Sequence, residues 1–116
     1  MRMIWNVVSD DIAPVSEFYR KVLGFEPAFE SDWYIQLARD GFEIGVLKRG
    51  REIDPTGDVN PGSTYPTFVV DDLAPVLEAA ENAIVSSPSD TFYGQRRAIL
   101  RDPDGRLMDV SMLIPA

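Results

Sequence analysis

Nearly the same seven residues occur twice in this chain, 61 positions apart. Residues 9–15 read SDDIAPV and residues 70–76 read VDDLAPV. Each copy follows an apolar, β-prone run. Each then places an Asp-Asp pair, which can cap a helix, before a proline that fits the first helical turn. Chance similarity between two helix starts is the alternative, but the strands predicted after each copy also match. The repeat therefore predicts two βαβββ modules in tandem.

Hydrophobic periodicity and turn residues place the elements of each module. A helix is expected at 13–23, where Gly24 ends it, and a shorter helix at 74–82. Asp40-Gly41 predicts a two-residue hairpin turn, and residues 102–105 predict the turn of a second hairpin. Besides the apolar runs MIWNVV and TFVV before the helices, strands are expected at 25–30, 33–39, 42–48, 83–86, 96–101 and 106–114.

The fold class expected from this order is α+β. The tandem βαβββ modules are expected to form a curved mixed sheet, with helices on the outer face and a ligand cavity on the inner face. Residues 50–62 are rich in glycine and proline and lack periodicity, which predicts a linker. We expect a single domain, 1–116, with module one at 1–49 and module two at 63–116.

The composition excludes several kinds of chemistry. The 116 residues include no cysteine and no histidine, so there is no disulfide, no thiol nucleophile and none of the commonest metal ligand or general base. A net charge of −8 repels nucleic acid and anionic membranes, although it also serves solubility alone. No apolar run is long enough to span a bilayer, and the N-terminus is too short and too soon acidic for a signal peptide. We expect a soluble, cytoplasmic protein that binds neither nucleic acid nor membrane.

Strand alternation sorts the residues of the expected sheet into two faces. One face is wholly apolar and is expected to pack against the helices: Trp5, Val7, Ile44, Val46, Phe68, Val70, Met108, Val110, Met112 and Ile114. The other is mixed, as a small-molecule site requires, and holds Ile4, Asn6, Val8, Glu43, Gly45, Leu47, Tyr65, Thr67, Leu107, Asp109, Ser111 and Leu113.

The two hairpins bring further residues to the mixed face if they pair as their turns indicate. Tyr34 and Gln36 then join it from the first hairpin, and Arg96 and Ala98 from the second. A β-bulge in either hairpin would move its residues to the opposite face. The alternative for the whole mixed face is the solvent-exposed side of an antiparallel sheet.

Two longer motifs indicate a family. Residues 9–27, SDDIAPVSEFYRKVLGFEP, space an Asp, a Phe-Tyr pair and Leu-Gly-Phe, and residues 93–110, YGQRRAILRDPDGRLMDV, contain an Arg followed by Asp-Pro-Asp-Gly. With the tandem modules, these motifs resemble the vicinal oxygen chelate superfamily of glyoxalase I, extradiol dioxygenases, fosfomycin-inactivating enzymes and bleomycin-resistance proteins. The resemblance extends over nearly the whole chain and is weakest at residues 81–92.

The resemblance also implies where a metal would bind. Metal-using members take ligands from the first and last strands of each module, and those positions fall on Ile4, Gly45, Tyr65 and Asp109. Only Asp109 is a usual ligand for a divalent transition metal. We therefore expect no metal and no cofactor. A weak Mg²⁺ or Mn²⁺ site built from Glu43 and Asp109 is the alternative.

The mixed face and its rim carry aromatic and polar side chains that suit a small-molecule ligand, although core packing is the alternative role of the aromatic ones. No catalytic residue can be named, because carboxylates, Tyr65 and unactivated hydroxyls are the groups left for catalysis. The candidate ligand-binding residues are Asn6, Trp33, Tyr34, Gln36, Glu43, Tyr65, Thr67, Phe92, Tyr93, Arg96, Asp109 and Ser111.

Three functions are compatible with these residues. Similarity to the metal-free bleomycin-resistance branch implies a non-catalytic homodimer that binds a small molecule and sequesters a cationic or aromatic antibiotic. The alternative is a glyoxalase- or dioxygenase-like lyase, isomerase or oxygenase that uses a weak or relocated divalent metal. A third option is a regulatory or structural domain without a ligand.

Overall fold

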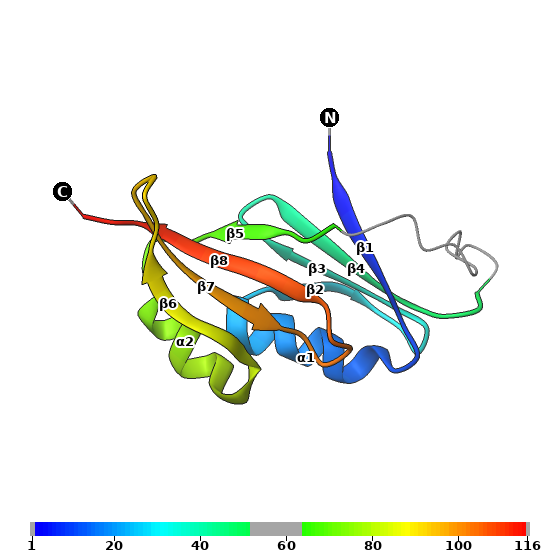
Figure 1. Ribbon diagram of the computed structural model, residues 1–116. Coiled ribbons are helices and arrows are strands. Elements are labelled where there is room, and N and C mark those ends of the chain that lie inside the picture. The colour runs from blue at the N-terminus through cyan, green and yellow to red at the C-terminus, as the bar shows by residue number, and fades with distance from the viewer. Residues whose placement is uncertain (1, 52–63, 116) are drawn as a thin grey trace. The chain divides into compact units, whose positions relative to one another are not determined.

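The computed structural model describes residues 2–51 and 64–115. The chain divides into two compact units, residues 1–62 and 63–116, and each unit contains a four-stranded sheet (Figure 1). The predicted linker at 50–62 falls almost entirely outside the described residues. No helix in the two described ranges is long and apolar enough to cross a membrane. The α+β fold with tandem βαβββ modules is confirmed.

The first unit follows the predicted element order. Its sheet has the strand order β1-β4-β3-β2, in which β1 and β4 run parallel and the other pairs run antiparallel. The elements are β1 (Ile4–Ser9), α1 (Ile12–Leu23), β2 (Glu26–Glu30), β3 (Tyr34–Arg39) and β4 (Phe42–Lys48).

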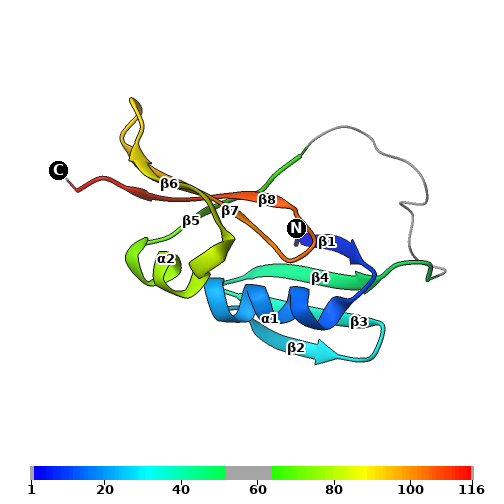
Figure 2. The same cartoon turned by 60° about the horizontal axis from the view of Figure 1, so that its bottom comes forward.

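Helix α1 covers one face of this sheet, as Figure 2 shows. The ring of Trp5 on β1 meets that of Tyr19 on α1 edge to face, with ring centroids 5.9 Å apart. Val15 on α1, Leu37 on β3 and Val46 on β4 are fully buried. These contacts confirm the predicted apolar face of the first unit. The other face of the sheet bears no helix of this unit, and we call it the open face.

The second unit repeats this arrangement with shorter elements. Its strand order is β5-β8-β7-β6, with β5 and β8 parallel. The elements are β5 (Thr67–Val69), α2 (Ala74–Ala80), a 3₁₀ turn (Glu81–Ala83), β6 (Ile84–Asp90), β7 (Gln95–Arg101) and β8 (Leu107–Leu113). Helix α2 is thus shorter than predicted, and β6 extends well beyond the predicted 83–86.

The start of α2 identifies the helix-covered face of the second sheet. The backbone N–H of Leu73 donates to Sδ of Met112 on β8, at 3.4 Å. Met108 and Val110 share that side of β8 by alternation and are fully buried. The residues between them, Asp109 and Ser111, therefore point to the open face of the second unit.

The repeated Asp-Asp corners differ in their local hydrogen bonds. In the second copy Leu73 occupies the N-cap position without a side-chain capping bond, and the carboxylate of Asp72 accepts from the backbone N–H of Ala74 at 3.1 Å in an Asx turn before the helix. In the first copy Asp11 occupies the N-cap position without a side-chain capping bond. There the hydroxyl of Ser9 accepts from the N–H of Asp11 at 3.1 Å instead.

The β7–β8 hairpin overturns one prediction. Arg101 pairs with Leu107, so the connecting loop has five residues, 102–106, instead of the predicted four. This one-residue difference exchanges the two faces of β7. Arg97 and Ile99 therefore pair with Ser111 and Asp109, whereas the sequence assigned Arg96 and Ala98 to those places.

Asp102 holds this loop in its five-residue form. The buried carboxylate accepts from the backbone N–H of Asp104 and of Arg106, each at 3.0 Å. It also accepts from the Arg106 guanidinium at 3.0 Å, with the Asp102 side chain fully buried. The loop, and with it the register of β7 on β8, thus depends on one carboxylate.

We predict that Asp102→Ala lowers the free energy of unfolding by about 2–3 kcal/mol, since it removes three hydrogen bonds to a charged group. Urea denaturation measures the change. The matched control is Asp104→Ala, which removes a partly exposed carboxylate from the same loop and should cost less than about 1 kcal/mol. Equal losses in the two variants would contradict this role of Asp102.

Candidate functional site

The open face of the first unit is built around a glycine. Gly45 on β4 pairs with Asn6 on β1 and with Gln36 on β3. A Cβ atom at Gly45 would lie 2.2 Å from Oδ1 of Asn6 and 2.8 Å from Oη of Tyr34. The missing side chain is therefore what allows these two polar groups to lie over the backbone of Gly45.

Glu43 lies two residues before Gly45 and on the same face. Its carboxylate forms a two-pronged ion pair with the guanidinium of Arg2 and accepts from Nε2 of Gln36 at 2.6 Å. The hydrogen bond with Arg2 holds the pKa of Glu43 below its usual range. Burial raises the pKa of the nearby Tyr34 hydroxyl, so Tyr34 is a hydrogen-bond donor at neutral pH. The predicted residues Asn6, Tyr34, Gln36 and Glu43 are thus brought together.

Three aromatic rings lie at the β2–β3 end of the first unit. The ring centroid of Tyr34 is 5.9 Å from that of Trp33 and 6.3 Å from that of Phe29. The guanidinium of Arg51 lies over the ring of Trp33, 4.7 Å from its centroid. The sequence predicted Trp33 and Tyr34 but missed Phe29, because a bulge after Pro27 sets which β2 residues face Gln36.

The open face of the second unit centres on Asp109. The carboxylate is almost fully buried, and its Oδ2 accepts from Oγ1 of Thr67 on the neighbouring strand at 3.3 Å. Nε of Arg97 lies 3.1 Å from the same oxygen, although its N–H is not aimed at it. The contact between Arg97 and Asp109 is therefore an ion pair without a hydrogen bond.

Two buried oxygens on this face have no hydrogen-bond partner among the residues that the structure describes. They are Oδ1 of Asp109 and Oγ of Ser111. Ser111 is the next residue of β8 on the same face, it is fully buried, and it pairs with Arg97 in the ladder. A buried polar atom without a partner costs about 1–3 kcal/mol and is uncommon outside functional sites.

Four predicted residues are not part of this cluster. Arg96 lies on the opposite face, where it pairs with Asp90 at 2.8 Å, so its predicted place on the mixed face is wrong. Phe92 and Tyr93 lie in the β6–β7 turn, beyond Leu113, several residues of strand away from Asp109. Tyr65 precedes β5 and is largely exposed.

Arg97 is a second residue of the site that the sequence did not predict. The pattern offered three consecutive charged or polar residues at 95–97, and only the loop length decides which of them faces Asp109. The signal that could have found it is Arg106. A basic residue just after Asp-Pro-Asp-Gly can pair with Asp102 and lengthen the loop by one residue.

The donor set does not fit a divalent metal. Of the four positions that the family resemblance assigns to ligands, Ile4 and Gly45 have no donor atom in their side chains. Asp109 is already paired with Arg97, and Glu43 with Arg2. The described residues contain no cluster of three or more acidic side chains that could hold a metal ion.

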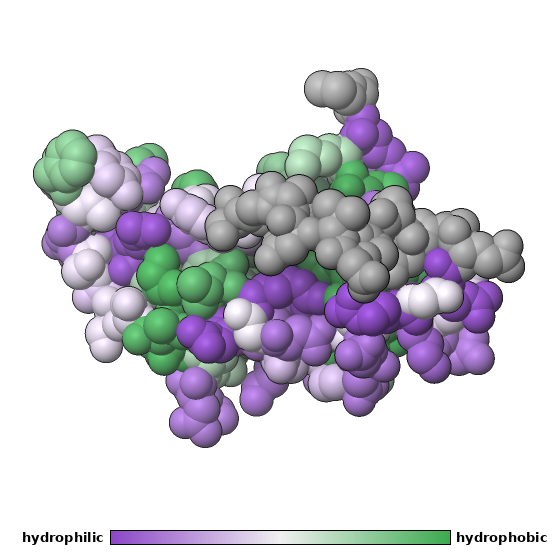
Figure 3. Space-filling view, turned by 45° about the vertical axis from the view of Figure 1, so that its right-hand side comes forward, coloured by the Kyte–Doolittle hydropathy of each residue, from purple (hydrophilic) through white to green (hydrophobic). Residues whose placement is uncertain are grey.

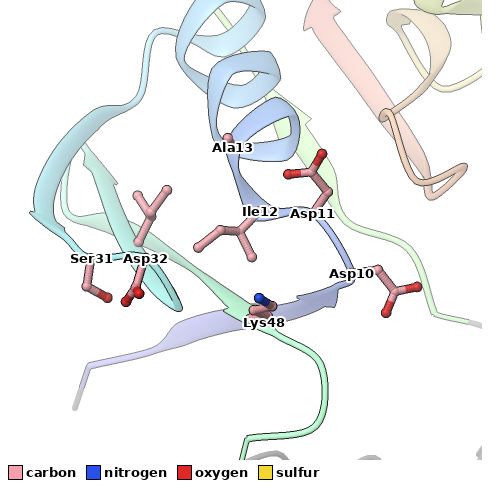
Figure 4. Close-up of a pocket in the computed structure, with 8 residues that line it drawn as sticks. Asp10, Asp11, Ile12, Ala13, Ser31, Asp32 and Lys48 are labelled. Atoms are coloured by element: carbon pink, nitrogen blue, oxygen red, sulfur yellow. The ribbon is translucent and has the colours of Figure 1, made fainter.

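A separate pocket of about 200 Å³ lies at the start of α1 (Figure 4). Asp10, Asp11, Asp32 and Lys48 line its rim with Ser31. The carboxylate of Asp10 is held by Arg49 at 2.9 Å, and the hydroxyl of Ser31 by the backbone of the β2–β3 turn. The polar groups of Asp10 and Ser31 are therefore already bound within the fold.

The Arg2–Glu43 pair predicts a pH dependence. Because the folded-state pKa of Glu43 is lowered, the pair contributes stability above the unfolded-state value of about 4.3 and loses it as the pH falls through the folded-state value. A carbon-detected NMR titration of the Glu43 carboxyl measures this. Arg2→Ala should raise the pKa of Glu43, and Arg20→Ala, which changes an exposed arginine of α1, should not. An equal pKa of Glu43 in all three proteins would contradict the pairing.

Comparison with known proteins agrees with the fold. The family model for the Glyoxalase/Bleomycin resistance protein/Dioxygenase superfamily matches residues 5–110. No curated protein matches the chain in sequence.

Solved structures match over nearly the whole chain. A glyoxalase/bleomycin resistance protein/dioxygenase family enzyme from Burkholderia phytofirmans has a TM-score of 0.81 at 20% identity, covering 96% of this chain and 97% of that one. TioX from Micromonospora sp. has a TM-score of 0.75 at 19% identity, with coverages of 98% and 99%. A lactoylglutathione lyase from Agrobacterium tumefaciens has a TM-score of 0.70 at 19% identity, with coverages of 97% and 92%.

At these identities the structures show a shared fold, whereas the family match rests on the sequence itself. That match includes both repeated helix starts and at least part of every strand of the two sheets. The chain therefore belongs to the Glyoxalase/Bleomycin resistance protein/Dioxygenase superfamily.

Proposed function

We propose that this protein binds a small organic molecule without a metal and without catalysing a reaction. The observation that supports this most strongly is the buried pair of unpartnered oxygens, Oδ1 of Asp109 and Oγ of Ser111, on a face without a helix of its own unit. Such atoms are rare in folded proteins, and a bound molecule, an ion or an ordered water is among the explanations for them. The apolar neighbours Val69 and Ile99 supply the hydrophobic surface that most ligand sites need.

The absence of catalysis is supported by the state of the acidic groups. A general base that works near neutral pH needs a raised pKa, and the pKa of Glu43 is shifted in the opposite direction. Asp109 is held by the guanidinium of Arg97. With no histidine or cysteine in the chain, Ser111 and Thr67 have no activating base.

The charges of the open faces disfavour a cationic ligand, and the aromatic rings favour a flat one. Each open face has its carboxylate matched by an arginine, so neither face offers an uncompensated negative charge at its centre. The net charge of −8 belongs mainly to helices, turns and loops. Hydrophilic side chains cover much of the surface visible in Figure 3, and hydrophobic ones gather in smaller groups. The rings of Phe29, Trp33 and Tyr34 suit a flat ligand.

A thermal-shift panel tests the proposal. Chelator-treated protein is mixed with bleomycin, mitomycin C and a library of aromatic acids, amides and amines, and separately with Zn²⁺, Ni²⁺, Mn²⁺ and Fe²⁺. A ligand at 100 times its Kd adds about 2.7 kcal/mol, which is a rise of several degrees in Tm. We expect rises with organic compounds only. A rise with a metal, followed by lyase or oxygenase turnover, would contradict the proposal.

The predicted homodimer and cytoplasmic location stay predictions.

Two buried serines provide a matched pair of variants. The hydroxyl of Ser9 makes two hydrogen bonds with the backbone of Asp11, so Ser9→Ala should lower the free energy of unfolding by about 1–2 kcal/mol. The hydroxyl of Ser111 has no partner among the described residues, so Ser111→Ala should leave stability unchanged or raise it by up to about 1 kcal/mol. Urea denaturation measures both. A loss in Ser111→Ala as large as that in Ser9→Ala would show that its hydroxyl is satisfied without a ligand.

A further inference from the structure

We propose that the open face of the second unit recognises a planar oxygen acceptor, a carboxylate or a carbonyl, through the guanidinium of Arg97, with Asp109 as its positioning residue. This inference rests on the proposed function and names the ligand chemistry of the same face. It departs from the cationic ligand that the family resemblance allowed.

The first step is that the carboxylate of Asp109 is already paired at one of its two oxygens. Its side chain is only 9% exposed, and Oδ1 is buried. Oδ2 contacts both Arg97 and the hydroxyl of Thr67. A ligand that approaches this face therefore meets the groups around Asp109 before it meets the carboxylate.

The second step is that Arg97 still has donors to offer. Nε of Arg97 is buried beside Asp109, but the side chain as a whole is 34% exposed. Within residues 2–51 and 64–115, its two terminal nitrogens have no hydrogen-bond acceptor. Those nitrogens form the planar fork that binds carboxylates and carbonyl oxygens most effectively. An ion pair at Nε fixes the fork in place and reduces the entropy lost on binding.

The third step is the local charge. Arg97, Ile99 and Arg101 alternate onto the open face of β7, and Arg101 is exposed. This face therefore has two guanidinium groups and one carboxylate, although the whole chain has a net charge of −8. A local excess of positive charge in an acidic protein favours an oxygen ligand here and disfavours an amine.

The fourth step is the apolar surface beside the guanidinium. Ile99 lies between the two arginines, and Val69 on β5 is 62% exposed next to Ser111. These side chains can contact the hydrocarbon part of a ligand whose oxygen is bound by Arg97. The arrangement fits an aromatic acid or an aromatic carbonyl compound.

Three small probes separate the possible ligand chemistries: benzoate, benzamide and benzylamine. Each is titrated into the ¹⁵N-labelled full chain, and the amide shifts of residues 97–101 and 109–111 report binding. We expect benzoate to shift these amides and benzylamine to leave them unchanged. Benzamide distinguishes the two sources of the oxygen. Binding equal to that of benzoate assigns a neutral carbonyl, and weaker binding assigns a carboxylate.

Variants of the two adjacent arginines test whether Arg97 binds the ligand. Arg97→Ala should weaken benzoate binding at least tenfold, whereas Arg96→Ala, which changes a neighbour on the other face, should leave it within about twofold. Because Arg97→Ala leaves a buried carboxylate unpaired, a second variant combines Arg97→Ala with Asp109→Asn and removes both charges. It should also lose benzoate binding, and its fold can be checked by the same spectrum.

The positioning role of Asp109 is tested by the effect of its substitution on Arg97. Asp109→Asn should weaken benzoate binding and change the Nε–H resonance of Arg97, and Asp109→Glu should restore part of both. A purely structural role would lower stability without moving that resonance.

The inference is overturned if benzylamine binds and benzoate does not, or if benzoate binds equally to wild-type protein and Arg97→Ala. Either result leaves the proposed function in place, because it would still be judged by the wider panel. Failure of every compound in that panel would remove the proposed function itself.

Discussion

The arrangement of the second unit depends on the buried carboxylate of Asp102. It accepts hydrogen bonds from the backbone of Asp104 and Arg106 and pairs with the Arg106 side chain, and these bonds close the β7–β8 loop at five residues. Because side chains alternate along a strand, a loop of one residue fewer would turn every β7 side chain to the other face. Arg97 would then leave the open face and Arg96 would replace it. The chemistry around Asp109 is thus decided by a turn several residues away.

The open faces of the two units share one electrostatic arrangement, a carboxylate paired with an arginine. A carboxylate near the centre of the face is held by an arginine from another strand or from the chain just before β1. In the first unit a glutamine completes the cluster, and in the second a threonine does. Two acidic groups that would otherwise attract cations are neutralised within their own units.

The sequence predicted the fold and most residues of the candidate site. The tandem repeat placed both helix starts and the order of all elements. Asp40-Gly41 has positive φ at both residues, 52° and 85°, as a two-residue hairpin turn requires, so Tyr34 and Gln36 were placed on the correct face. Asp102-Pro103-Asp104-Gly105 was equally recognisable as a turn. The length of this turn was not recognisable, because the fifth residue, Arg106, joins the loop through its side-chain interaction with Asp102, which local propensity does not encode. The extent of β6 was missed for a related reason: its serine-rich residues have little strand preference and pair because β7 lies beside them.

Cross-strand nuclear Overhauser effects measure the register of β7 on β8 directly. We expect contacts between the backbones of Ile99 and Asp109 and of Arg97 and Ser111, which are paired in the ladder. Contacts between Ala98 and Asp109 and between Arg96 and Ser111 would contradict it. They would place Arg96 beside the buried carboxylate and remove Arg97 from the open face.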